Sequence, residues 1–498
     1  MNNWQRVSPV AVLYFIANNL SIIINNIIYM IPLIVTSYNT LLENPLWLAL
    51  AVSGLIGLIT ISAFLQYYFF RFRLSEQTIE IKSGVFKKLQ LNLPFERIQN
   101  VKLITPFYFR PFNYTTLELD TAGSAKSEAK IVALDDMLAH SLKQEILAQA
   151  IERTNEQDES EKGCEEELTL NRRSLRDLVI HGMTNNRVWI FIALLAPFIE
   201  PASNYIDEVL ISYGINISDM LSPTSHAWWE LGLYVAALLL ISYFIVIIFS
   251  IFGSIIAFYG YTLTKHGNNY IRRSGLLTRH EVVMKLPRLQ LVISQQDWLD
   301  RIIDRINLRF EQVNNQMANQ AGQEIRNKIM VPSINRHQFI ALLNDAWPDN
   351  QFDNTTFSPI SKRFIIKNIM LLLPLIIGLL AFLLKHNQWQ ISLILLAFTG
   401  LAAALITLRW YRWGFATDNR YIYIRKGLFG INYYVFPIHK VQQTKLHQSV
   451  LMARNQLASI SLVLASGVQK IPFIHYTTAT EIIDTSLYVV EQSKQNWM

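Results

Sequence analysis

Six long apolar stretches constrain the fold of this chain more than any other feature of its sequence. They lie at 10–35, 46–70, 187–208, 228–259, 363–384 and 389–408. About 20 consecutive apolar residues let a helix cross a bilayer, and each stretch approaches or exceeds that length. The third stretch is the weakest because Pro197, Glu200 and Pro201 interrupt it. The sequence therefore predicts six transmembrane helices separated by polar segments.

The positions of basic residues predict how these helices are oriented. The stretches form three pairs; the short connections within the first two pairs contain no Lys or Arg, and the third contains only Lys385. The other flanks are basic, for example at Arg71, Arg172, Arg363 and Arg409. Lys and Arg are retained on the cytoplasmic side of membrane proteins. Both termini and all long polar segments are therefore predicted to be cytoplasmic.

The composition argues against several function classes. Charged residues make up 16% of the chain, against about 25% in an average soluble protein. The net charge of +7 is explained by the basic cytoplasmic flanks, so no nucleic-acid partner is expected. The single cysteine, Cys164, cannot form an internal disulfide, and no CxxC motif or Cys/His cluster predicts a structural metal site.

Motifs that carry chemistry are equally scarce. No phosphate-binding loop, dinucleotide-binding turn or nucleophile elbow is present. His280 and Glu281 begin an HExxH-like string, but Met284 stands where the second histidine is required. Three further histidines fall within one polar segment and are interpreted as surface or packing residues: His439, His447 and His475. We therefore expect no enzyme activity, catalytic residue, cofactor or metal site.

Three polar segments share one pattern: the first polar segment (71–153), the second (261–347) and the third (410–498). They align without gaps over the stretch that surrounds a glycine. Four columns agree, given in segment order: the glycines Gly84, Gly275 and Gly427; the bases two residues earlier, Lys82, Arg273 and Arg425; the later bases Arg97, Arg288 and Lys440; and the glutamines Gln99, Gln290 and Gln442. The agreement predicts an internal repeat.

The local pattern of each segment predicts several antiparallel strands followed by one helix. Short runs of β-branched residues stop at the glycine, which is expected to adopt the positive φ of a tight hairpin turn. The closing helices are expected to begin at N-cap residues Asp135, Ser333 and Thr478. In the first of them, an apolar face is predicted at Leu138, Leu142, Ile146 and Ile151.

This arrangement resembles the bacterial membrane-flanked pleckstrin-homology-like (PH-like) domain family, and the layout of the chain is similar to that of YdbT-like polytopic membrane proteins. The resemblance rests on the repeated glycine turn, on the base and glutamine that follow it, and on the membrane hairpins. The second segment departs from the pattern by having Lys285 where the others have Pro94 and Pro437. The resemblance implies an α+β membrane protein in the bacterial cytoplasmic (inner) membrane, with both termini cytoplasmic.

In the implied architecture, six transmembrane helices in three hairpins alternate with three small PH-like domains of β-barrel or β-sandwich form, each closed by a C-terminal helix. The predicted boundaries are hairpin 1 at 1–70, domain 1 at 71–153, an acidic and basic linker at 154–186, hairpin 2 at 187–260, domain 2 at 261–347, a linker at 348–362, hairpin 3 at 363–409 and domain 3 at 410–498.

Basic residues around the turns are the remaining candidates for a binding site: Lys82, Lys87, Lys88, Arg272, Arg273, Arg279, Arg425 and Lys426. They could contact anionic lipid head groups, dock a protein partner, or be ordinary charges on solvated strands. We expect a non-enzymatic membrane scaffold acting in cell-envelope maintenance or stress tolerance. Its expected partners are membrane lipids and either further copies of the chain or another membrane-flanked PH-like protein.

A lipid or small-molecule transporter built by the six helices is the alternative. Four asparagines on one face of the first apolar stretch bear on it, namely Asn18, Asn19, Asn25 and Asn26. Hydrogen bonds between helices would explain them, and so would a polar permeation path.

Overall fold

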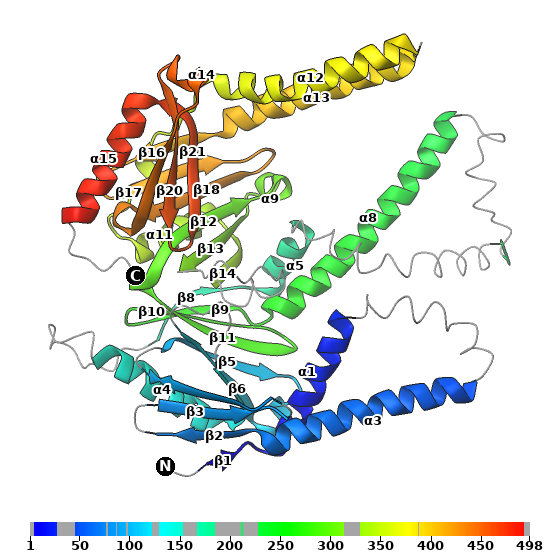
Figure 1. The fold of residues 1–498 in the computed structure, drawn as a ribbon, viewed down its shortest axis with the longest axis vertical. Helices are drawn as coiled ribbons and strands as arrows, with labels where there is room; N and C mark the ends of the chain where they lie inside the picture. Colours follow the sequence, from blue (N-terminus) through cyan, green and yellow to red (C-terminus); the bar gives the residue numbers. More distant parts are fainter. Residues whose placement is uncertain are drawn as a thin grey trace. The chain divides into compact units, whose positions relative to one another are not determined.

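The computed structural model describes residues 4–26, 45–75, 78–85, 87–95, 98–121, 129–152, 167–184, 211–212, 228–312, 329–386 and 388–492. These residues form two compact units (Figure 1). Unit 1 consists of Met1–Leu168 and Asn269–Val283, and unit 2 of Thr169–Asn268 and Met284–Met498.

Long apolar helices confirm the prediction of membrane segments in its general form. The described part of the chain contains four helices that are long and apolar enough to cross a membrane. They are α3 (Pro45–Phe69), α8 (Trp228–Phe258), α12 (Arg363–Lys385) and α13 (Trp389–Arg412). A shorter apolar helix, α1 (Ala11–Asn25), precedes α3. The predicted stretch at 187–208 lies outside the described residues, so the number six stays a prediction.

One of the four asparagines of the first stretch makes a contact between helices. Gln66 Nε2 on α3 donates a hydrogen bond of 3.0 Å to Asn19 Oδ1 on α1. Asn26 instead donates to the carbonyl oxygen of Ile22 in its own helix, at 2.7 Å. Asn18 is exposed, and the side chain of Asn25 lies outside the described residues. The interhelical interpretation is therefore confirmed at Asn19.

The first polar segment contains two groups of three strands and a closing helix. The elements are β2 (Arg71–Leu74), β3 (Thr78–Ser83), β4 (Leu89–Pro94), β5 (Ile98–Pro106), β6 (Tyr114–Thr121), β7 (Ala129–Asp135) and α4 (Asp136–Glu152). A short strand before the membrane helices, β1 (Gln5–Arg6), adds to β2 and gives the sheet order β1-β2-β3-β4.

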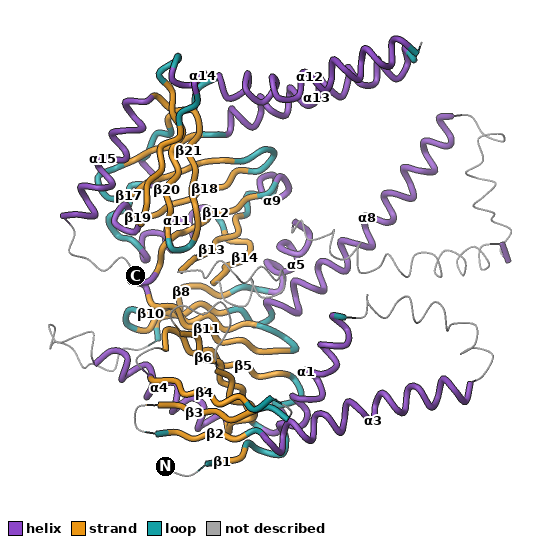
Figure 2. The backbone as a smooth tube through the Cα atoms, viewed as in Figure 1, coloured by secondary structure: helices purple, strands orange, loops and turns teal. Residues whose placement is uncertain are grey.

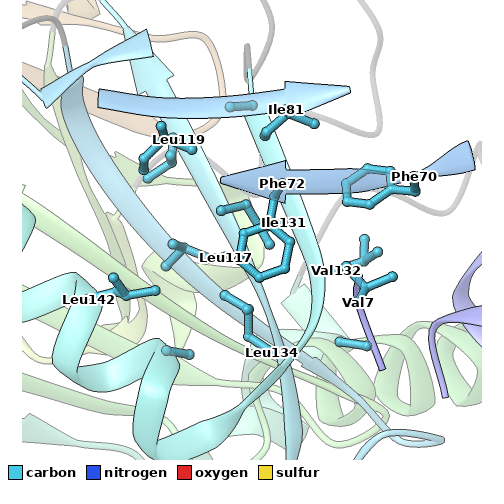
Figure 3. Close-up of a cluster of buried hydrophobic side chains, with 14 of the residues drawn as sticks. Val7, Phe70, Phe72, Ile81, Leu117, Leu119, Ile131, Val132, Leu134 and Leu142 are labelled. Carbon is cyan, nitrogen blue, oxygen red and sulfur yellow. The ribbon is translucent and has the colours of Figure 1, made fainter. Parts of the chain in front are cut away.

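Alternating burial explains how these strands form a core. In β3, Ile79 and Ile81 are buried while the residues between them are not, because successive strand side chains point to opposite faces. Figure 3 shows Ile81 near Phe72, Leu117 and Ile131, which are all buried. The predicted strands and their apolar face therefore form as expected.

The other two polar segments repeat this order of elements. The second contains β9 (Thr262–His266), β10 (Asn269–Ser274), β11 (Thr278–Lys285), β12 (Leu289–Gln296), β13 (Ile306–Gln312), β14 (Ile329–Ile334) and α11 (Arg336–Ala346). The third contains β16 (Gly414–Thr417), β17 (Tyr421–Lys426), β18 (Ile431–Pro437), β19 (Val441–His447), β20 (Leu457–Leu464), β21 (Gly467–His475) and α15 (Tyr476–Gln492). Before the membrane helices lie β8 (Leu168–Arg172) with α5 (Leu175–Thr184), and β15 (Ser358–Pro359).

Sheets continue from one polar segment into the next. In unit 1, strands of the first and second segments follow in the order β7-β6-β5-β11-β10. In unit 2, strands of the second and third segments form the order β14-β13-β12-β18-β17-β16-β15. Figure 2 labels the first five of them, from β14 to β17. Strands therefore form hydrogen-bonded pairs both within one polar segment and between adjacent segments.

The aligned glycines lie at tight turns, as predicted. Gly84 and Gly275 have φ values of 99° and 119°, a region that favours glycine. Gly427 does not have a positive φ, so this part of the prediction is wrong for the third segment. A Cβ atom at any of the three would overlap the backbone carbonyl oxygen of the residue three positions later. Close backbone approach is thus the property that all three positions share.

The starts of the closing helices only partly follow the prediction. Asp135 Oδ1 accepts a hydrogen bond of 3.0 Å from the backbone N–H of Met137, as expected of an N-cap. The prediction is wrong for Ser333, which lies in β14, because Asn335 forms a capping box with Gln338 instead. It is also wrong for Thr478, because α15 begins at Tyr476.

The predicted apolar face of α4 is shifted in the structure. Leu142 and Ile146 are buried as expected, but Leu138 is 38% exposed and Ala139 takes its place in the core. The side chain of Ile151 lies outside the described residues. Leu138 follows the helical spacing, but the path of α4 over the sheet decides which of two adjacent apolar residues is covered.

A further regularity was not predicted from the sequence. The third residue before each closing helix has a positive φ: Ala133 at 51°, Ser333 at 50° and Phe473 at 51°. The strand pairing shifts register at each of these points. The same β-bulge therefore precedes the closing helix in all three polar segments.

Candidate functional site

Two of the three aligned bases stack on an aromatic ring. Lys82 Nζ lies 4.0 Å from the centroid of the Trp4 ring, and Arg425 Cζ lies 5.3 Å from that of Phe357. Trp4 immediately precedes β1, and Phe357 immediately precedes β15. Such cation–π contacts contribute about 0.5–1 kcal/mol when partly exposed. Each base thereby holds the short strand that leads into a membrane hairpin.

The third aligned base, Arg273, contacts the equivalent position through charge. Its NH1 and NH2 atoms donate hydrogen bonds of 2.8 and 2.9 Å to Glu167, which immediately precedes β8. Its Nε donates to Glu281 at 2.8 Å, and Glu281 also forms an ion pair with Lys143 on α4. In all three segments the aligned base therefore contacts the residue that immediately precedes a short strand, which is β1, β8 or β15.

The pKa shifts of these groups follow from their ion pairs and hydrogen bonds with one another. Burial alone would raise the pKa of Glu281, but the charges of Lys143 and Arg273 outweigh burial and hold it below the usual range. Hydrogen bonds from Arg273 likewise lower the pKa of Glu167. Those from Glu167 are the largest cause of the raised pKa of Arg273, with burial opposing them. All three groups therefore stay charged near neutral pH.

The remaining turn bases differ in their accessibility. Lys87, Lys88 and Arg279 are exposed to solvent. Arg272 is only 3% exposed. Lys426 Nζ lies 3.8 Å from the centroid of the Tyr434 ring, and burial lowers the pKa of this lysine. The turn bases predicted as a binding site therefore do not form one uniformly exposed surface.

The later aligned columns lie near the connection between strand groups. Lys440 Nζ donates a hydrogen bond of 2.8 Å to the carbonyl oxygen of Pro287, and burial lowers the pKa of Lys440. Burial also lowers the pKa of Arg288. Gln290 is fully buried, whereas Gln442 is exposed. Arg97 and the side chain of Gln99 lie outside the described residues.

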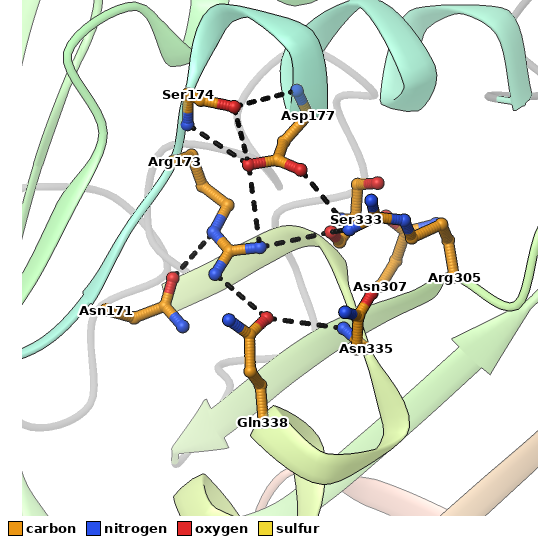
Figure 4. Close-up of polar contacts among 9 residues, drawn as sticks. All are labelled: Asn171, Arg173, Ser174, Asp177, Arg305, Asn307, Ser333, Asn335 and Gln338. Atoms are coloured by element: carbon orange, nitrogen blue, oxygen red, sulfur yellow. Dashed lines mark hydrogen bonds and ion pairs between the residues drawn. The ribbon is translucent and has the colours of Figure 1, made fainter.

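A second polar network in unit 2 was missed by the sequence reasoning (Figure 4). Arg173 is 7% exposed and donates to Asn171 Oδ1 at 2.6 Å, to the Ser333 carbonyl oxygen at 3.1 Å and to Gln338 Oε1 at 3.0 Å. Arg305 NH1 donates to Asp177 Oδ1 at 3.2 Å. The sequence does not reveal this network, because Ser333 and Gln338 lie 160 and 165 residues away from Arg173.

A buried carboxyl group, that of Asp300, lies in the second polar segment. Asp300 has no exposed surface, and burial raises its pKa to about 6. Asn307 Nδ2 donates a hydrogen bond of 2.8 Å to Asp300 Oδ2. This bond fixes the short helix α9 (Trp298–Ile302) against β13. The arrangement is that of a structural contact, since Asn307 also accepts from the backbone N–H of Ser333 at 3.0 Å.

A pocket of about 660 Å³ lies in unit 2 between the residues that precede α12 and the third polar segment. Its ionisable lining residues are Asp418 and His475. Of the three predicted histidines only His475 lines it; His439 and His447 do not. Among the residues that the structure describes, no group of three or more His, Cys, Asp or Glu side chains could hold a metal ion.

These features define a membrane protein that combines apolar helices with repeated β-rich segments, and comparison with known proteins identifies the class. Residues 25–150 and 369–489 match the family model of the bacterial PH domain. Two regions of the chain therefore match the bacterial PH domain family, and the resemblance inferred from the sequence is confirmed.

One relative extends the comparison to nearly the whole chain. The sequence is 22% identical over 481 residues to the UPF0699 transmembrane protein YdbT of Bacillus subtilis (strain 168), covering 94% of each chain. No solved structure matches. The name of the relative agrees with the apolar helices found here, and together they support a membrane location.

Proposed function

We propose that this chain is a non-enzymatic scaffold of the bacterial cytoplasmic membrane, with six transmembrane helices and three cytoplasmic PH-like domains. These domains would bind anionic lipid head groups, one another or a protein partner, in cell-envelope maintenance or stress tolerance. Support comes from the bacterial PH domain matches, from the apolar helices and from the shared order of elements in the three polar segments. Both termini would then be cytoplasmic.

The proposed binding of anionic lipid rests on the turn bases that are exposed to solvent. The aligned bases Lys82, Arg273 and Arg425 already contact other residues of the protein, namely Trp4, Glu167 and Phe357 in that order. These contacts support a structural role for the three bases. Lys87 and Lys88 lie between β3 and β4 and are exposed. Near an anionic leaflet each base contributes about 1 kcal/mol, and membrane tethering keeps these bases at high effective concentration.

Binding of short-chain lipids to the detergent-purified full-length protein tests this. We expect dioctanoyl phosphatidylglycerol to bind more tightly than dioctanoyl phosphatidylcholine, with the difference lost at high salt because counterions screen the charges. The double variant Lys87→Ala, Lys88→Ala should weaken phosphatidylglycerol binding by about 30-fold, from about 1 kcal/mol per base.

A matched control uses two exposed bases outside the aligned stretch, Arg454 and Lys470. Replacing both by alanine should leave the preference unchanged. Equal affinity for the two lipids in the wild-type protein would rule out recognition of anionic head groups at these turns and would leave a protein partner as the remaining candidate.

A further inference from the structure

Polar segments are joined to one another by β-sheet pairing. In unit 1, β11 of the second segment pairs antiparallel with β5 of the first. In unit 2, β18 of the third segment pairs antiparallel with β12 of the second. We call these pairings the first join and the second join. In each, the strand after the glycine turn of one segment lies against the fourth strand of the segment before it.

The two joins have the same register. Leu103 pairs with Glu281 in the first join, and Ser294 pairs with Tyr433 in the second. Leu103 and Ser294 both follow the glycine of their own segment by 19 residues, and Glu281 and Tyr433 both follow theirs by 6. A shift of one residue would turn every side chain to the other face, so the register is a specific property of the segments.

The third segment has the same joining strand, but no strand of the described residues pairs with its outer edge. β19 is at the edge of its three-stranded sheet in the described part of the chain. Its residue Leu446 is 40% exposed, whereas the equivalent residues of the joined strands, Leu103 and Ser294, are 4% and 2% exposed. β12 is buried along most of its length, whereas β19 is mostly exposed.

The first segment has the complementary strand, whose outer edge is likewise unpaired among the described residues. β4 follows the turn of Gly84, as β11 and β18 follow theirs, and it is the last strand of the order β1-β2-β3-β4 among the described residues. Leu89 on β4 is 53% exposed. Exposed edge strands present unpaired backbone N–H and C=O groups and so invite pairing with another chain. One copy therefore carries both halves of a further join.

We propose that β19 of one copy pairs antiparallel with β4 of a second copy, in the register of the two internal joins. That register places Leu446 opposite Gln90 of the second copy, and Leu89–Pro94 opposite 442–447. The occupant of each open edge is a second copy because the chain supplies a strand of matching position and length. The turn base Lys88 immediately precedes Leu89, and Arg279 at the equivalent position pairs with Thr105 in the first join. Pairing of β4 uses backbone N–H and C=O groups and not these charges, so the proposal does not depend on whether the turn bases bind lipid.

The proposed contact uses a different surface on each partner. Such a head-to-tail contact leaves a free β4 at one end and a free β19 at the other, so it continues into a ring or an open chain of copies. Copies held in the same membrane meet at high effective concentration, which favours pairing of strands that are too short to associate in dilute solution. Self-assembly of the scaffold is therefore encoded by its own repeat.

Site-specific cross-linking of full-length protein in native membranes tests the contact. Two differently tagged copies are co-expressed in a Cys164→Ser background, one with Gln90→Cys and the other with Leu446→Cys. Directly opposed residues on antiparallel strands have Cβ atoms about 4.5–5.5 Å apart, so mild oxidation should link the two tags. A single chain that carries both cysteines should give a ladder of oligomers.

The controls separate this contact from other associations. Val468→Cys with Gln90→Cys should give no linked product: Val468 is 45% exposed on β21, and the equivalent strands β7 and β14 end their sheet orders in the described residues. Leu446→Cys copies linked only to each other would show a symmetric contact and overturn the proposal. It would equally be overturned if Leu446→Cys linked only to a different protein, or if Gln90→Cys reacted no more than Val468→Cys.

Discussion

Removing the charge of Glu281 should open the first join. The Glu281 and Lys143 side chains are 11% and 9% exposed, so solvent screens their ion pair little. Removing one partner of a buried pair costs about 3–5 kcal/mol because the other charge is left without compensation. Arg273 remains beside Lys143 in Glu281→Gln and adds repulsion. We therefore expect Glu281→Gln to destabilise the first join by about 3 kcal/mol or more, which raises the equilibrium constant for its opening by a factor of at least about 100.

Glu167→Gln provides a matched comparison, since it removes a charge from the same network. The Glu167 side chain is 40% exposed, and exposed ion pairs contribute about 0–1 kcal/mol. Hydrogen exchange of the full-length protein, followed by mass spectrometry over β5, β11 and α4, measures both variants. Exchange there should be about 100-fold faster in Glu281→Gln and less than about 5-fold faster in Glu167→Gln.

The pH dependence follows from the direction of the pKa shift. The folded pKa of Glu281 lies below its ordinary value of 4.5, so its stabilisation is present above that value and is lost as pH falls through the folded pKa. The protection factors of the β11 amides, which correct for slower intrinsic exchange in acid, should therefore fall below pH 4.5 in the wild-type protein more than in Glu281→Gln. The reasoning is refuted if Glu281→Gln exchanges like wild type, or if the two variants are equally affected.

Two further predictions concern the turns and the topology. Gly427→Ala and Gly430→Ala should both lower the melting temperature of the third segment, because a Cβ would overlap the carbonyl oxygen of Gly430 in the first variant and of Gln296 in the second. The control is Gly378→Ala in α12, where a Cβ meets nothing within 4 Å and stability should not change. Equal melting temperatures for all three variants would contradict this reasoning. In a Cys164→Ser background, impermeant thiol reagents should label cysteines from outside intact cells at Asn39, Ser212 and Gln388 but not at Ser83 and Ser274. Labelling at Ser83 would reverse the proposed orientation.

Local sequence was sufficient for much of the architecture. The apolar stretches predicted membrane helices because their length matches a bilayer, and four of them appear as helices of that kind. The glycine columns predicted tight turns because glycine readily adopts a positive φ, and the turns form at all three positions. Only Gly84 and Gly275 have that φ, and the structure shows that close backbone approach is what all three positions share. The gap-free alignment also predicted the shared order of strands and closing helix. These properties depend on residues close together in the chain.

Tertiary structure decided what the aligned residues contact. Lys82, Arg273 and Arg425 were candidates for contact with lipid or a protein partner, or ordinary strand charges. Their contacts in the structure are with residues that precede the apolar helices and are distant in sequence. The same holds for Leu103 and Leu446, which occupy equivalent positions with very different exposure. Periodicity specifies which face of a strand is apolar, but it does not specify which strand lies beside it. That choice depends on the edges left open once each segment has folded.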